Sequence, residues 1–279
     1  MKLHTINTGY FKLDGGAMFG VVPKSMWNRL NPADENNLCS WALRCLLVED
    51  GNRLILIDNG IGNKQPEKFF SHYYLHGEDT LDKSLATHGF HRNDITDVFL
   101  THLHFDHCGG SIEREGDLLV PAFKNAVYWS NPMHWDWAIH PNDREKASFL
   151  KENILPIQES GQLQFVEVKE DAAISENFEI IFVNGHTNNM MLPKIKYGDN
   201  TVVFMADLLP SAAHIPIPYV MAYDMFPYTT LQEKKKFLHE AAEGGYTLFF
   251  EHDPTIECCS LQMTDKGVRA DKTFKLSEL

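Results

Sequence analysis

Residues 101–110 read Thr-His-Leu-His-Phe-Asp-His-Cys-Gly-Gly, which places three imidazoles and one carboxylate within six positions. The segment just before this run is apolar and of strand length. His102 and His104 alternate and therefore point to the same side of an extended chain, whereas Asp106 and His107 turn toward the same point from the following loop. So many titratable groups are costly to bring together unless a cation neutralises them. The run predicts a metal site where a strand ends.

Three later residues share this position at the end of an apolar segment of strand length: His186, Asp207 and His252. Each of them alone would be an ordinary polar residue. Because all three follow separate strands, we expect them to meet the first cluster at one edge of a sheet sandwich. A mixed set of histidines and carboxylates suits Zn, Mn or Fe.

The order and spacing of these seven residues resemble the metallo-β-lactamase superfamily, most closely its N-acyl-homoserine lactonase and organophosphate-hydrolase-like branch. The resemblance extends from about residue 3 to residue 252. It implies an α+β fold, a four-layer αβ/βα sandwich, formed by one metallo-hydrolase domain that spans residues 1–279. It also implies that Asp58, within Leu56-Ile-Asp-Asn-Gly60, supports the ligand loop without binding metal itself.

The same resemblance implies two divalent metal ions, with Zn²⁺ favoured and Fe, Mn or Co as alternatives. One ion would be bound by His102, His104 and His186, the other by Asp106, His107 and His252, with Asp207 bridging both. A hydroxide held between the ions would attack a lactone carbonyl, because metal coordination lowers the pKa of water to about 7. Asp106 would pass a proton to the leaving group. The expected substrate is an N-acyl-homoserine lactone, which implies quorum quenching; phosphotriesters and other esters or thioesters are the alternatives.

One position departs from the lactonase pattern. The best-known homoserine lactonases carry a tyrosine three residues after the bridging aspartate, and here that residue is Pro210. Four prolines between residues 208 and 227 exclude a regular helix, and an irregular segment just after a ligand is well placed to contact substrate. Tyr223 and His214 in this segment are the candidates to replace the missing tyrosine as catalytic residues.

Large apolar side chains near the ligands are the predicted substrate contacts. The segment 11–20 contains three glycines and is expected to be a loop. Met18 and Phe19 in this loop, Trp27 beyond it, and Phe105 in the metal-binding run are assigned to the wall of a substrate pocket. Burial in an ordinary core is the alternative for Met18, Phe19 and Trp27.

The composition argues against several other functions. Asp and Glu outnumber Lys and Arg by 38 to 25, and a net charge of −13 disfavours nucleic-acid binding. Five irregularly spaced cysteines argue against a disulfide framework and favour a reducing compartment. Neither a membrane span nor a signal sequence is evident. We therefore expect a cytoplasmic protein that can form a homodimer. Its expected substrate is small, uncharged and partly apolar, and the tail after residue 254 is expected to be polar and peripheral.

Overall fold

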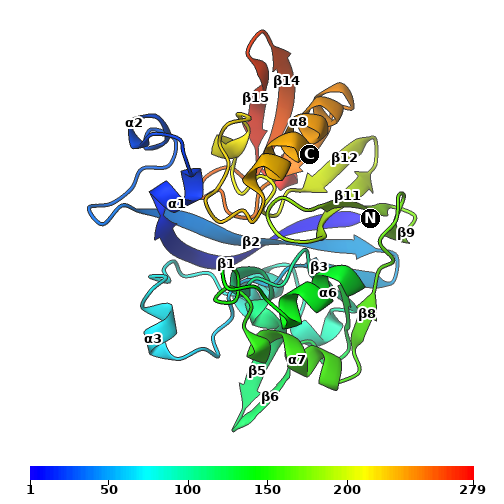
Figure 1. Cartoon of the computed structure of the whole chain (residues 1–279). Helices are drawn as coiled ribbons and strands as arrows, with labels where there is room; N and C mark the ends of the chain where they lie inside the picture. Colours follow the sequence, from blue (N-terminus) through cyan, green and yellow to red (C-terminus); the bar gives the residue numbers. More distant parts are fainter.

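Two mixed β-sheets form the centre of the computed structural model, which describes residues 1–279 (Figure 1). The first sheet has the order β1-β2-β3-β4-β7-β8, antiparallel from β1 to β3 and parallel from β3 to β8. Its strands are β1 (Lys2–Asp14), β2 (Leu38–Asp50), β3 (Arg53–Ile57), β4 (Asp97–Phe99), β7 (Val127–Ser130) and β8 (Leu163–Phe165). A separate hairpin consists of β5 (Ile112–Glu115) and β6 (Leu118–Pro121).

The second sheet has the order β15-β14-β13-β12-β11-β10-β9, in which only β12 and β13 are parallel. Its strands are β9 (Ala173–Ser175), β10 (Phe178–Val183), β11 (Met190–Tyr197), β12 (Asn200–Phe204), β13 (Thr247–Phe249), β14 (Cys258–Thr264) and β15 (Gly267–Phe274). The expectation of a peripheral tail after residue 254 is wrong, because β14 and β15 complete this sheet. Cys258 and Cys259 at the start of β14 are fully buried.

Eight short or medium helices connect the strands. They are α1 (Gly15–Phe19), α2 (Lys24–Trp27), α3 (Glu67–Phe70), α4 (Leu81–Thr87), α5 (Phe105–Cys108), α6 (Pro132–Ile139), α7 (Lys151–Glu159) and α8 (Pro227–Glu243). Four 3-10 turns add η1 (Arg92–Asp94), η2 (Gly109–Ser111), η3 (Ala212–His214) and η4 (Leu276–Glu278). The loop expected over residues 11–20 is wrong: β1 continues to Asp14, whose side chain accepts a 2.8 Å hydrogen bond from the N–H of Ala17 and so begins α1.

Apolar burial arranges these elements in four layers. The largest core lies between the sheets and extends to α8; it includes Leu46, Ile57, Phe99, Phe178, Val203, Phe249 and Leu238. A second core lies between the first sheet and α4, α6 and α7, and it includes Leu47, Val98, Leu85, Trp135 and Ile154. In Figure 1, α6 and α7 accordingly lie on one side of the two sheets and α8 on the other. The predicted α+β sandwich is confirmed. None of its helices is both long and apolar enough to cross a membrane.

Candidate metal centre

Four strands end close to one another and supply the predicted ligands. β4 precedes His102 and the run that follows it, β10 precedes His186, β12 precedes Asp207, and β13 precedes His252. The structure brings all seven residues together in two groups, within each of which the potential ligand atoms lie within 4.8 Å of one another. The first group is His102, His104, His186 and Asp207, and the second is Asp106, His107 and His252.

The backbone near the ligands is held in uncommon conformations. Asp58, directly after β3, has φ 55°, and Ala206, directly before Asp207, has φ 40°. Non-glycine residues in this left-handed region cost about 1–3 kcal/mol each and concentrate at functional sites. Gly110 is required for another reason, because a Cβ atom there would collide with the carbonyl oxygen of Asn59. The ligand loop therefore packs directly against the loop that follows β3.

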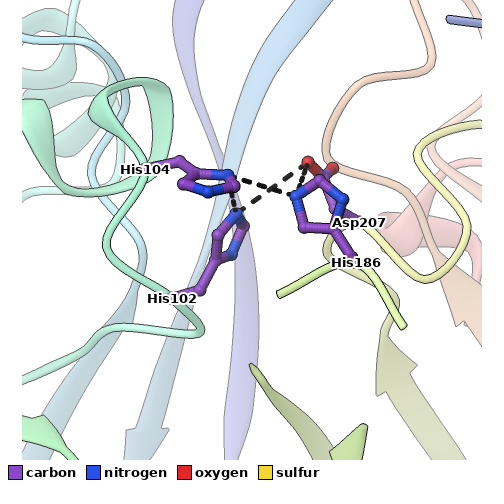
Figure 2. Close-up of side chains that lie close together, drawn as sticks. All are labelled: His102, His104, His186 and Asp207. Atoms are coloured by element: carbon purple, nitrogen blue, oxygen red, sulfur yellow. Dashed lines mark hydrogen bonds and ion pairs between the residues drawn. The ribbon is translucent and has the colours of Figure 1, made fainter. Parts of the chain in front are cut away.

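The side chains of the first group converge on one point (Figure 2). His104 Nδ1 lies 3.1 Å from His102 Nε2 and 3.1 Å from His186 Nε2. Asp207 Oδ2 lies 3.1 Å from His186 Nε2. All four residues are buried. Three imidazole nitrogens and one carboxylate oxygen thus share one small volume.

The second group lies directly beside the first, and Asp207 joins the two. His107 Nε2 and His252 Nε2 are 3.1 Å apart. The other oxygen of Asp207, Oδ1, lies 3.3 Å from His252 Nε2. Asp106 Oδ2 is more distant, at 3.8 Å from both His107 Nε2 and His252 Nε2. Asp207 therefore occupies the position expected of a bridging ligand.

In all five histidines, the ring nitrogen that points away from the centre has an acceptor. The acceptor for His102 is the hydroxyl oxygen of Thr101. This hydroxyl donates its own hydrogen to Asp58 at 2.6 Å, so its oxygen is left to accept from His102. The five acceptors are Thr101 Oγ1 for His102 (3.0 Å), Glu145 Oε1 for His104 (3.1 Å), Asp58 Oδ2 for His107 (3.1 Å), Asp224 Oδ1 for His186 (2.9 Å) and the carbonyl of Ala42 for His252 (2.8 Å). Each outer nitrogen is consequently a donor, and in the neutral ring each inner nitrogen presents a lone pair.

Five lone pairs that face one another at about 3 Å cannot form hydrogen bonds among themselves, so the centre requires positive charge. The pKa of His186 shows the same demand. Burial acts to lower the pKa of His186, but the negative charges of Asp207 and Asp224 raise it to about 10. By contrast, burial lowers the pKa of His102 well below its usual value, and the charges of His107, His104 and His186 lower it further, so this ring stays neutral. Nitrogen and carboxylate donors in this arrangement fit a pair of divalent cations of the Zn²⁺ class.

A cavity of about 390 Å³ opens beside the centre. Among its lining residues are five of the predicted ligands: His104, Asp106, His186, Asp207 and His252. Apolar and aromatic side chains form much of the remaining wall: Leu13, Met18, Tyr73, Phe105, Met221, Tyr223 and Met225. Three residues that the sequence assigns to substrate or catalysis, Met18, Phe105 and Tyr223, therefore line the cavity.

The other three residues assigned to substrate or catalysis lie behind the cavity wall. The Phe19 ring stacks on Trp27 at 5.3 Å between centroids and on His214 at 4.6 Å, and all three side chains are buried. His214 uses both ring nitrogens, with Ser211 Oγ at 2.9 Å and the carbonyl of Met18 at 2.9 Å. His214 is therefore not available to replace the missing tyrosine. It holds the backbone of Met18, while Phe19 and Trp27 belong to the core.

Sequence reasoning missed several residues that complete the centre. Glu145 and Asp224 accept hydrogen bonds from ligand histidines, and Glu251 Oε2 lies 3.0 Å from His107 Nδ1. Tyr73 and Arg144 line the cavity. Among these residues, the sequence indicates only Asp224, because it belongs to the proline-rich segment 208–227 that is expected to lie near the substrate.

Comparison with a family model identifies the family, and individual relatives are similar to this chain. The chain matches the Metallo-beta-lactamase superfamily over residues 44–252. An N-acyl homoserine lactonase of Bacillus thuringiensis is 23% identical over 265 residues, which cover 90% of this chain and 93% of the relative. A probable metal-dependent hydrolase from Staphylococcus aureus has a TM-score of 0.89 at 29% identity, covering 98% of this chain and 96% of that one. AidC, a dizinc quorum-quenching lactonase, has a TM-score of 0.79 at 22% identity, covering 99% of this chain and 97% of AidC. The family match extends over well more than half of the chain, and this protein belongs to the metallo-β-lactamase superfamily.

Proposed function

We propose that this protein is a metal-dependent hydrolase that opens the lactone ring of N-acyl-homoserine lactones. The observation that carries the proposal is the convergence of five inward-facing imidazole nitrogens around Asp207, beside a cavity with a largely apolar wall. Relatives support the substrate class. The B. thuringiensis relative is an N-acyl homoserine lactonase, and AidC binds an N-acylated L-homoserine product.

Two divalent cations at this centre would lower the pKa of a water molecule to about 7 and polarise the scissile carbonyl. The first ion would be held by His102, His104 and His186, the second by Asp106, His107 and His252, and Asp207 would contact both. Asp106 lines the cavity, and its contacts with His107 and His252, both at 3.8 Å, are longer than the 3.1 Å contact of Asp207 with His186. This placement suits it to carry a proton to the leaving alkoxide.

Tyr223 is our candidate for the tyrosine that position 210 lacks. Its side chain lines the cavity beside Asp106. Tyr223 is 42% exposed. Partial burial, followed by the negative charge of Asp14, raises the pKa of Tyr223 to about 12, so its hydroxyl stays protonated at neutral pH. A neutral hydroxyl can donate a hydrogen bond to the substrate carbonyl as negative charge develops on it. Pro210 itself is buried, and its carbonyl accepts a 3.1 Å hydrogen bond from the N–H of His252.

The test is a hydrolysis screen of the zinc-loaded protein with N-hexanoyl-homoserine lactone, an aryl phosphotriester and an aryl thioester. We expect kcat/KM to be highest for the lactone, and we expect His102→Ala to lose both zinc and turnover. His72→Ala is the matched control, because His72 is exposed and lies outside the two ligand groups. Preferential hydrolysis of the phosphotriester would favour the second candidate function, to which the apolar cavity is also suited. Failure to open any lactone would exclude the first.

A further inference from the structure

The two ligand groups are supported by different parts of the fold. In the second group, the outer nitrogens are held by residues in or directly after the strands. Asp58 follows β3 and Glu251 follows β13, and both lie close to His107 Nδ1, while Ala42 in β2 accepts from His252. Asp58 and Glu251 are fully buried. The second group is therefore anchored in the sheets themselves.

Two histidines of the first group are instead supported by residues outside the sheets. His104 donates to Glu145, which lies in the loop between α6 and α7. His186 donates to Asp224, which lies in the irregular segment before α8. Of the first group's three histidines, only His102 is supported from a strand end, through Thr101.

Glu145 is held firmly within its loop. Its side chain is buried, and its second oxygen accepts hydrogen bonds from Trp137 Nε1 at 2.7 Å and Asn142 Nδ2 at 3.1 Å. The first oxygen is thereby directed at His104 Nε2, and the donated proton leaves Nδ1 of His104 as the nitrogen that faces the centre. Glu145 thus fixes both the orientation and the tautomer of this ligand.

Arg144, the preceding residue, connects the same loop to the second support. Its Nη2 donates to the backbone carbonyls of Ala222 and Asp224, the latter at 3.2 Å. Asp224 in turn accepts from His186 Nδ1 at 2.9 Å. One surface loop therefore supplies the partner of His104 and contacts the segment that carries the partner of His186.

We propose that the α6–α7 loop, through Glu145 and Arg144, positions the ligands of the first metal ion but not those of the second. Glu145 is a positioning residue for His104, and Arg144 is a positioning residue for His186 through Asp224. This inference rests on the metal centre of the proposed function and is independent of its substrate. Loss of either side chain should therefore release one metal ion selectively.

The test compares Glu145→Gln and Arg144→Met with the wild-type protein by zinc content after dialysis against zinc-free buffer. We expect two zinc ions per chain in the wild type and one in each variant, because loss of such a support lowers metal affinity by about 10–100-fold. Cobalt-substituted protein should lose only part of its visible absorption. Asp143→Asn is the matched control, because Asp143 is an exposed acid in the same loop. It should retain both ions.

Two outcomes would overturn the proposal: retention of both ions with unchanged affinity, or loss of both ions together. If Glu145→Gln does not fold, Trp137→Phe decides, since it keeps the aromatic ring and removes one donor to Glu145. That variant should weaken the same ion by a smaller factor, and unchanged affinity there would also count against the proposal. A protein that opens no lactone but shows the selective zinc loss would disprove the proposed function alone.

Discussion

The Nε2 atom of His134 accepts a 2.9 Å hydrogen bond from the backbone N–H of Leu103, the residue between the first two ligands. Its Nδ1 donates to the carbonyl of Asn188 at 2.6 Å, close to the ligand His186. One buried imidazole therefore ties together two loops that carry ligands. The bond accepted at Nε2 requires a neutral ring, and burial lowers the pKa of His134 to about 4.

This low pKa predicts a pH-dependent contribution to folding. The unfolded chain binds a proton at His134 near pH 6.5, whereas the folded chain does so only near pH 4. The contribution of neutral His134 to the free energy of unfolding is therefore complete above pH 6.5 and decreases as the pH falls toward 4. The total loss is about 3 kcal/mol at most. Urea unfolding of metal-free wild-type protein and His134→Gln at several pH values measures it. A difference between the two that stays constant from pH 7 to pH 4 would contradict this account.

Lys234 predicts a second effect on stability. Its side chain is fully buried in α8, and its ammonium group donates to the carbonyls of Pro216 (3.2 Å), Ile217 (3.4 Å) and Tyr219 (2.6 Å). Lys234→Met should leave the carbonyls of Ile217 and Tyr219 without a donor, whereas the carbonyl of Pro216 still accepts from the N–H of Tyr219 at 3.0 Å. We expect the substitution to destabilise the protein by about 3 kcal/mol. Because the same segment continues to the cavity wall, kcat/KM should fall as well. Lys235→Met, at an exposed position of the same helix, should change neither chemical denaturation nor activity.

Tyr223 allows a direct test of the substrate interaction. Tyr223→Phe keeps the ring in the cavity wall but removes the hydroxyl proposed to donate to the carbonyl. We expect kcat for the lactone to fall about 100-fold, the usual cost of losing one such donor, with little change in KM or zinc content. Tyr73→Phe, which alters the other tyrosine of the wall, should have a smaller effect. The opposite ranking would assign the role to Tyr73.

The convergence of the seven residues could be predicted from sequence because their signal is local. The motif from His102 to His107 is continuous, and His186, Asp207 and His252 each follow an apolar strand. Glu145, Asp224 and His134 carry no comparable signal. They reach the centre from loops and from α6, whose positions depend on how the helical layer packs on the sheet.

The errors have a physical origin as well. Phe19 and Trp27 are apolar near the ligands, but composition does not distinguish a cavity wall from the core behind it. The hairpin of β14 and β15 was missed because it lies at the edge of the second sheet, where residues such as Gln262 and Lys272 remain exposed and give the segment a polar character.

Removal of the metal ions should leave the centre without the positive charge that its imidazoles and carboxylates require. Without cations, protonation is what relieves the repulsion between the facing lone pairs. The pKa of about 10 for His186 shows that Asp207 and Asp224 favour the protonated form of this ring, whereas the pKa of His102 is held well below its usual value. Protons and zinc therefore compete for the same nitrogens.

Adding zinc to chelator-treated protein should raise Tm strongly, since a ligand at 1,000 times its Kd stabilises by about 4 kcal/mol. The increase should shrink as the pH falls from 7.5 to 5.5, and Mg²⁺, which prefers oxygen ligands, should have little effect. A rise in Tm that is equal with both metals, or that is independent of pH, would show that the imidazoles are not the ligands.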